Sequence, residues 1–453
     1  MRSTQAVITG LGIVSPIGIG ATDYWTALLN KTSGIRGLKD CRDDESTPGD
    51  LTPAQAQDQC PIPGLWIGAP ILDFEAKKYV RPRKALKVMC REIRTAFAAS
   101  QLAIQDAGLA DVLPVTDDSP FASADVATIF GGEMYYGPPT EMIDSIAACF
   151  TDDGDINVGA FGMAARRGVM PLWMLKFLPN MPACHVGISV NAQGPNNTLV
   201  LGDVSGPAAL IESIGCLDRG LAKIAITGAA GTRASITRMN YRSDSPMATI
   251  ADPVANSSRP HDPSSDGIVG GEAAACLIVE TAEEASARGA KPIASVAGFA
   301  SRFSPSNAMR TGGRTSKNDA AGTRASSTAI GLSIDAALSK ARIAAGEIGV
   351  IISNASGDPV SDSAEREAIE TRLSGVPVVA PMASIGHTGA ACGTIGIATG
   401  ALCLAHQKIP PTVNSDAASV NLLDSTQPLS ASYALCLSYT SEGNAIAIVL
   451  SKG

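Results

Sequence analysis

Short apolar runs, many of them rich in Val and Ile, alternate along the chain with longer, helix-like segments that are rich in Ala. The apolar runs predict β-strands at residues 7–9, 126–130, 223–227, 274–279, 350–353 and 378–380. The longer segments predict helices at residues 84–106, 208–219, 328–344, 363–373 and 388–407, and several of these end at Gly or are followed by Pro. This alternation is typical of a layered α/β protein.

The same pattern divides the chain into two α/β halves that show no clear sequence repeat. A charged run at 281–291 follows one predicted strand and precedes another, so we place the halves at residues 1–285 and 286–453. A polar stretch rich in Asp, Gln and Pro at 39–63 predicts a surface insertion.

Composition narrows the range of partners and locations. A length of 453 residues with 45% hydrophobic side chains allows a large core. The longest apolar runs are far shorter than the roughly 20 residues that cross a bilayer, and the first residues lack an export-signal pattern, so we expect a cytoplasmic protein without a membrane segment. A net charge of −8 argues against nucleic acid as the main partner.

The ten cysteines are scattered, with no CxxC pair and no spacing typical of zinc ligands. Most lie in apolar surroundings, which favours buried, reduced thiols. The sequence therefore predicts no metal site and no cofactor.

Several ordered motifs resemble the β-ketoacyl-acyl-carrier-protein synthases, which belong to the thiolase-fold condensing enzymes. The opening VITGLGIVSPIG at 7–18 resembles their first strand and turn. RPHD at 259–262 with DGIVGGEA at 266–273, SIGHTGAA at 384–391 and IPPTVN at 409–414 resemble three further family segments in the family's order. The resemblance spans residues 6–450 and implies a five-layered αβαβα arrangement of two similar halves.

The family's condensation chemistry needs a cysteine nucleophile, two histidines and a backbone oxyanion hole. The gapless match of 198–206 to the family's elbow puts Asp203 at the cysteine position, and an aspartate cannot form the thioester. Ser356 replaces the first histidine, Met382 stands where the family often has a lysine, and His387 matches the second histidine. Asp203, Ser356 and His387 are thus the family's catalytic positions, in a set unsuited to condensation.

No other histidine fills the gap, because His185, His261 and His406 lie in segments that match non-catalytic parts of the family. The family's glycine-rich gating loop is also missing, and SYTSEGN at 438–444 occupies its place. Two interpretations of the Asp203 and His387 pair stay open. Either Asp203 is a new acid or base beside a hydrogen-bonding His387, or it caps a helix in an inactive site where His387 is held by packing.

Other nucleophiles are less attractive. A serine at the position of Ser205 is ordinary in the family, which favours a structural role. Cys184 and Cys392 match small-residue positions, and neither is a good replacement nucleophile.

A strongly basic segment at 77–94 stands out in this acidic chain, and it is either a solvated helix face or a binding site. The similar region of related synthases docks the acidic acyl-carrier protein, so the resemblance implies carrier binding by Arg83, Lys84 and Lys87. The apolar run at 170–179 is interpreted as core or dimer contact, or as the border of an acyl tunnel.

Three functions remain in view. The first is a non-condensing homologue similar to chain-length factors, which would complete a homodimer, or a heterodimer with an active ketosynthase, in fatty acid, polyketide or polyene biosynthesis. Asp203 departs from those factors, which commonly carry glutamine there. The second is a thioester-acting enzyme with altered chemistry, such as acyl transfer, hydrolysis or decarboxylation, using Asp203 and His387. The third is an ordinary 3-oxoacyl synthase, against which the missing cysteine argues directly.

Overall fold

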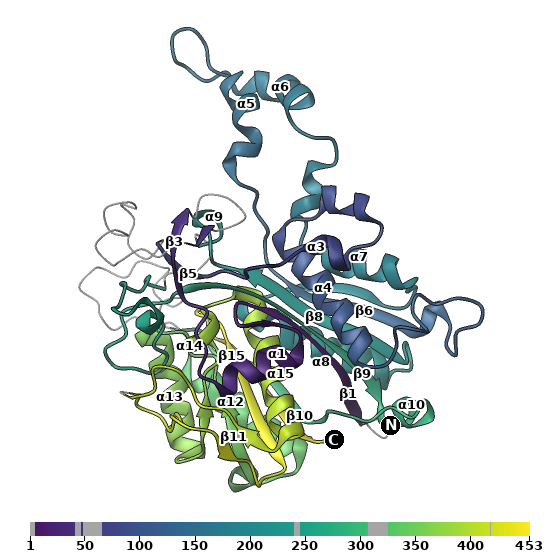
Figure 1. The fold of residues 1–453 in the computed structure, drawn as a ribbon, viewed down its shortest axis with the longest axis vertical. Coiled ribbons are helices and arrows are strands. Elements are labelled where there is room, and N and C mark those ends of the chain that lie inside the picture. The colour runs from purple at the N-terminus through teal and green to yellow at the C-terminus, as the bar shows by residue number, and fades with distance from the viewer. Residues whose placement is uncertain (1–4, 41–46, 49–65, 240–244, 307–324, 417) are drawn as a thin grey trace.

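The computed structural model describes residues 5–40, 47–48, 66–239, 245–306, 325–416 and 418–453. Most of the predicted insertion at 39–63 therefore lies outside the described residues. The chain forms a stack of helical and sheet layers, from which a narrow arm that contains α5 (Ile143–Ala147) and α6 (Phe161–Gly168) projects (Figure 1).

Hydrogen bonds join the principal strands of both halves into one continuous sheet. Their order is β7 (Asn196–Val200), β6 (Val126–Gly132), β8 (Ile224–Thr232), β9 (Gly270–Thr281), β1 (Ala6–Ser15), β10 (Ala294–Phe303), β16 (Asn444–Lys452), β15 (Tyr433–Tyr439), β11 (Ile348–Ile352) and β12 (Val378–Val379). Short strands complete the pattern: β2 (Gly18–Ile19), β3 (Arg36–Asp40), β4 (Thr47–Pro48), β5 (Ile67–Ala69), β13 (Lys408–Ile409) and β14 (Gln427–Pro428).

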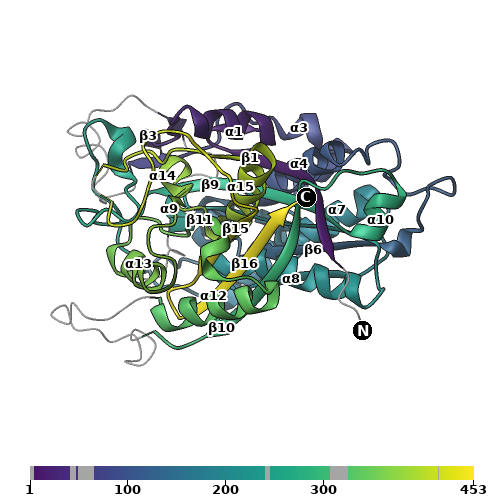
Figure 2. The ribbon, with the colours of Figure 1, turned by 90° about the horizontal axis from the view of Figure 1, so that it is seen from below.

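Helices cover both faces of each half of the sheet and give the predicted five layers (Figures 1 and 2). One outer layer contains α4 (Arg91–Asp106) and α7 (Met181–Val190). The central layer, between the two halves of the sheet, contains α8 (Ser205–Asp218) and α15 (Cys392–His406). The other outer layer contains α12 (Ser327–Ala341) and α13 (Pro359–Leu373). The shorter helices are α1 (Ala21–Leu29), α3 (Ala76–Tyr79), α5 (Ile143–Ala147), α6 (Phe161–Gly168), α9 (Ile236–Met239), α10 (Ala282–Ala287) and α14 (Met382–Ile385).

Side chains alternate between two cores because successive strand residues point to opposite faces. On β6, Ile129 packs into the core around α8 and α15, whereas Phe130 packs under α4 and α7. On β15, Cys436 and Leu437 divide in the same way between the central core and the core under α12. A strand covered on both faces is apolar throughout, which explains the continuous apolar runs in the sequence.

Two predicted helices begin later than the sequence pattern indicates. The helix expected at 84–106 is broken, because a 3₁₀ turn (Arg83–Val88) ends before the buried, extended pair Met89 and Cys90, and α4 starts at Arg91. The helix expected at 388–407 starts at Cys392, after the left-handed Gly389. The predicted boundary between 285 and 286 falls inside α10 and stays a prediction.

One segment, Gly389–His406, is long and apolar enough to cross a membrane by composition alone, but 89% of it is buried within the protein. It comprises a 3₁₀ turn and α15, which lie in the central helical layer between the two halves of the sheet. Its apolar character is thus explained by the core that it fills.

Candidate active site

Asp203 lies on a tight turn between a strand and a helix. β7 leads into a 3₁₀ turn (Gly202–Val204), and α8 follows directly at Ser205. Gly202 has a φ of 64°, a conformation in which a side chain is strained. The Ser205 hydroxyl accepts from the Leu201 N–H at 2.8 Å and donates to the Gly202 carbonyl at 2.6 Å, so this fully buried serine stabilises the turn.

His387 is held in place by its own backbone. Its N–H donates to the Val269 carbonyl at 2.7 Å, and its carbonyl accepts from the Gly271 N–H at 2.9 Å, which attaches the segment before α15 to the start of β9. Because β9 and α15 are both buried, the backbone that carries His387 is fixed in position.

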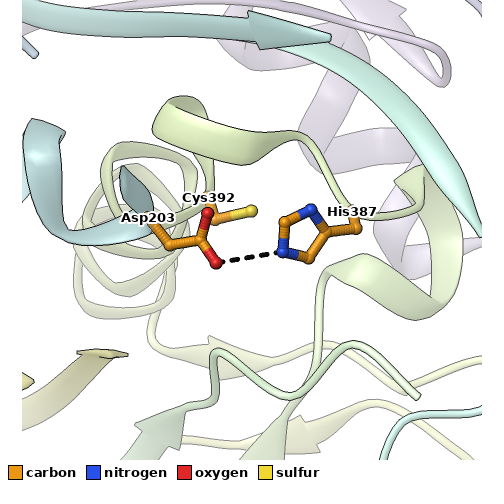
Figure 3. Close-up of side chains that lie close together, drawn as sticks. All are labelled: Asp203, His387 and Cys392. Carbon is orange, nitrogen blue, oxygen red and sulfur yellow. Dashed lines mark hydrogen bonds and ion pairs between the residues drawn. The ribbon is translucent and has the colours of Figure 1, made fainter. Parts of the chain in front are cut away.

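The two side chains meet as the match at the turn predicts (Figure 3). His387 Nε2 lies 3.0 Å from Asp203 Oδ2, with His387 only 7% exposed. The Gly389 N–H points at His387 Nδ1 from 3.4 Å, so Nδ1 accepts and the proton sits on Nε2, which donates to the carboxylate. The imidazole donor that a bound carbonyl would need is therefore engaged by Asp203.

Ser356 lies on a buried loop that the acidic side chains of α13 hold. Asp362 accepts from the backbone N–H groups of Ser356 and Gly357, at 3.0 and 2.9 Å. Glu365 accepts from the Ser353 hydroxyl at 2.8 Å and from the Tyr439 hydroxyl at 3.2 Å. Burial raises the pKa of Asp362 to about 7 and the pKa of Glu365 to about 7.

A buried ion pair that the sequence reasoning missed lies beside Asp203. Arg233 donates to both carboxylate oxygens of Glu133, at 2.7 and 2.6 Å, and both side chains are less than a tenth exposed. Glu133 and Arg233 directly follow the carboxyl ends of β6 and β8, which are neighbouring parallel strands. This pair could have been predicted from the sequence, because two residues of opposite charge follow the ends of two strands that are parallel neighbours in the sheet.

The residues expected at the site share one small cavity of about 90 Å³. Its lining is mainly polar and includes Asp203, Arg233, Asn354, Ser356, His387 and Glu442. Glu442 belongs to the turn between β15 and β16, in the segment that stands in place of the gating loop. The structure therefore brings together Asp203, Ser356 and His387, while their catalytic role stays a prediction.

Cys392 begins α15 and also faces this pair (Figure 3). Its sulfur accepts from the Thr388 N–H at 3.3 Å and lies 3.6 Å from the sulfur of Met382. Burial raises the pKa of the Cys392 thiol, and the nearby Asp203 carboxylate acts in the same direction. A buried neutral thiol is a poor nucleophile, so the structure supports the prediction that Cys392 does not replace the missing cysteine.

Metal-ligating side chains do gather here. The ligand atoms of Asp203, His387 and Cys392 all lie within 4.8 Å of one another. Asp203 lies 184 positions before His387, so no ligand spacing that includes all three residues was visible in the sequence.

The basic segment divides into an exposed part and a buried part. Arg83, Lys84 and Lys87 are exposed, and all three lie on the 3₁₀ turn Arg83–Val88. Arg91, by contrast, is buried and donates to Glu272 at 2.9 Å, so it belongs to the interior. The prediction of one basic surface from 77 to 94 is thus too broad at its carboxyl end.

Family models match both halves of the chain. The N-terminal domain of β-ketoacyl synthases matches residues 4–285, and the C-terminal domain matches residues 307–416. The chain belongs to the β-ketoacyl synthase family. The chain is also 28% identical over 423 residues to 3-oxoacyl-[acyl-carrier-protein] synthase 2 of Synechocystis sp., which covers 91% of this chain and 88% of that relative.

Solved structures share the fold of this β-ketoacyl synthase homologue over its full length. The ishigamide ketosynthase/chain length factor superimposes with a TM-score of 0.74 at 22% identity, covering 100% of both chains. A ketosynthase bound to its acyl-carrier protein and a hexaketide, from a type II polyketide synthase, gives a TM-score of 0.75 at 19% identity, again covering 100% of both chains. These likenesses confirm the thiolase-like fold.

Proposed function

We propose that this chain is a non-condensing β-ketoacyl synthase homologue that works as the partner of an active ketosynthase, in the manner of a chain-length factor, in fatty acid or polyketide assembly. The observation that carries the proposal is the carboxylate of Asp203 at the nucleophile position, hydrogen-bonded to His387 at 3.0 Å. A carboxylate that attacked a thioester would form a hydrolysable anhydride instead of a stable acyl relay.

The cavity itself supports this proposal. A volume of about 90 Å³ is below the ~300–1,000 Å³ of typical ligand pockets, and its lining is polar. A growing acyl chain is apolar and needs more room. If this chain takes part in assembly, the growing product lies mainly in the cavity of its partner.

A second chain is favoured by the surface around β7. Among the described residues, β7 pairs with β6 alone, so no strand covers its other edge. All but three of the exposed large apolar side chains in the described residues fall between Met134 and Leu201; the three exceptions are Leu221, Phe303 and Leu332. An open strand edge beside exposed apolar side chains is typical of a protein interface. We therefore propose that a second synthase-fold chain, either identical or an active ketosynthase, covers this face.

The acyl-carrier protein is the proposed second partner. Arg83, Lys84 and Lys87 supply exposed positive charge in a chain whose net charge is −8. An acidic carrier is steered to such a patch by complementary charge.

The test incubates carrier protein, malonyl and starter groups with this chain alone, with a candidate ketosynthase alone, and with both. We expect extended product from the pair and none from this chain alone, with a length that changes when residues of this chain that border the partner's cavity are substituted. Extended product from this chain alone would refute the proposal. Release of free acid by this chain, abolished in Asp203→Asn, would instead favour a thioester hydrolase.

A further inference from the structure

Three potential metal ligands converge beside the cavity from separate elements. Asp203 comes from the turn before α8, His387 from the segment attached to β9, and Cys392 from the first residue of α15. Figure 3 shows the carboxylate, the imidazole and the sulfur lying close together, and their ligand atoms lie within 4.8 Å of one another. Carboxylate oxygen, imidazole nitrogen and thiolate sulfur are all ligands of zinc in proteins.

We propose that Asp203, His387 and Cys392 bind one divalent transition-metal ion, with zinc as the best match. Zinc lies about 2.0–2.3 Å from such ligand atoms, which places the ligands roughly 3–4 Å from one another. Asp203 and His387 already meet this separation at 3.0 Å. The other two pairs of ligand atoms, those that include the Cys392 sulfur, need to approach by roughly an ångström or less to reach this separation.

The surroundings of the sulfur suit a metal-bound thiolate. The Thr388 N–H lies 3.3 Å from Cys392 Sγ and the Thr388 hydroxyl lies 3.4 Å from it, so two donors face the atom that would carry negative charge. Hydrogen bonds from outside the ligand shell fix the direction of the ligands in metal sites. Cys392 also begins α15, where the helix dipole favours a thiolate.

The charges at the site balance when the ion is bound. Arg233 lines the same cavity as Asp203 and His387, and Glu133 neutralises its charge by a bidentate pair at 2.6–2.7 Å. A divalent cation would then be matched by the Asp203 carboxylate and the Cys392 thiolate. The remaining coordination position would face the polar cavity, where a water or a carbonyl oxygen could bind.

Binding moves protons in a defined way. The Cys392 thiol loses its proton, and the proton on His387 Nε2 must leave that nitrogen so that its lone pair can reach the metal. Nδ1 then carries the ring proton, and the long 3.4 Å contact from the Gly389 N–H is lost. Affinity for zinc should therefore rise with pH. The inference does not depend on the pairing proposed above, because it concerns only side chains of this chain.

The experiment titrates the full, chelator-treated chain with Zn²⁺ by calorimetry and with Co²⁺ by absorbance. We expect one ion per chain and a Co²⁺ spectrum with a thiolate charge-transfer band. Cys392→Ser should abolish that band and weaken Zn²⁺ binding at least ~100-fold, since even changes outside the ligand shell cost about 10–100-fold. Cys403→Ser is the matched control, because Cys403 is buried on the same helix.

Folding is checked by thermal unfolding of each variant. If Cys392→Ser fails to fold, Asp203→Asn gives a second test at a side chain that is 21% exposed, and it should weaken Zn²⁺ binding comparably. No stoichiometric binding by the unsubstituted chain, or equal binding by the chain and by a folded Cys392→Ser or Asp203→Asn variant, would overturn the proposal.

Discussion

The cavity at Asp203 and the face formed by the exposed apolar side chains between Met134 and Leu201 contrast with each other, because the cavity is mainly polar and the face is apolar. The cavity, which should receive an apolar acyl chain, is about 90 Å³ and is lined mainly by polar groups. The face exposes apolar side chains in the single chain, such as Ile188 at 77% and Leu172 at 66%.

The arm makes the contrast sharper. It contains α5 and α6 and projects from the layered body (Figure 1), and its side chains Ile143, Phe150 and Val158 are each more than half exposed. Exposed apolar groups on a projecting segment are stabilised when another chain covers them. The exposed apolar side chains fit the proposed association with a second chain, and the small polar cavity fits the proposed lack of condensation.

The largest expected effect comes from placing charge on the open edge. Val200→Asp with Leu201→Asp puts two carboxylates at the end of β7, where Val200 and Leu201 are 42% and 46% exposed. Burying unpaired charge in an interface costs several kcal/mol. Association with itself or with a ketosynthase should weaken on the order of a hundredfold or more, measured by sedimentation or light scattering.

The control for this change is Leu332→Asp, at an apolar side chain that is 46% exposed on α12, away from that face. If the double variant, the control variant and the unsubstituted chain associated equally well, the apolar face would be ordinary surface and its contrast with the cavity would carry no meaning for association.

The interior is tested next by removing one charge of its buried pair. Glu133→Gln leaves Arg233 without its counter-charge in a site that water barely reaches. The free energy of unfolding should fall by about 3 kcal/mol. Chemical unfolding followed by circular dichroism measures it.

A matched pair lies on the surface. Glu212→Gln breaks the ion pair with Arg219, whose side chains are 40% and 56% exposed. Because exposed pairs contribute about 0–1 kcal/mol, this variant should unfold almost as the unsubstituted chain does. Similar losses in the two variants would contradict the distinction between interior and surface.

These regions also differ in how well the sequence predicts them. The predicted strands and helices overlap β1, β6, β8, β9, β11, β12, α4, α8, α12, α13 and α15, and the meeting of Asp203 with His387 follows from one gapless turn. The strands β7, β10, β15 and β16 were not predicted. The ion pair of Glu133 and Arg233 was not predicted, because the two residues are a hundred positions apart and meet only through the order of strands in the sheet. The break at Met89 and Cys90 was hidden for a similar reason, since tertiary burial overrides local helix pattern there.

A smaller effect is expected at the basic surface. Reversing Arg83, Lys84 and Lys87 to glutamate should weaken carrier-protein binding about tenfold at low salt and less at high salt, because screening shortens the range of charge attraction. Titration calorimetry at two salt concentrations measures it. The same reversal at Lys31, Lys291 and Lys452, which are also exposed, controls for net charge. If both triple variants bound the carrier protein equally well, the basic segment would be an ordinary solvated surface and not a binding site.

The smallest effect concerns pH. The pKa of Glu365 is raised to about 7 by burial, so the folded chain holds this proton between about pH 4.5 and 7 while the unfolded chain releases it. Stability from this group is therefore present below pH 4.5 and is lost as pH rises to 7. Asp362 acts in the same direction, whereas the pKa of His261, lowered by burial to about 3, acts in the opposite direction.

Glu365→Gln should accordingly reduce the loss of melting temperature between pH 5 and 7, by an amount equivalent to on the order of 1–2 kcal/mol. Thermal unfolding at half-unit pH steps compares the variant with the unsubstituted chain. An unchanged difference between pH 5 and 7 would show that Glu365 is ionised in both states.

The central claim, that this chain cannot take up an acyl group, is tested most directly by intact-protein mass spectrometry after incubation with acyl-carrier thioesters. The mass of the unsubstituted chain should stay unchanged, because Asp203 offers no thiolate. Asp203→Cys should fail to restore condensation, because Ser356 still stands in place of the first histidine. The account would be contradicted if the mass of the unsubstituted chain rose by one acyl group and if this chain made extended product without any partner.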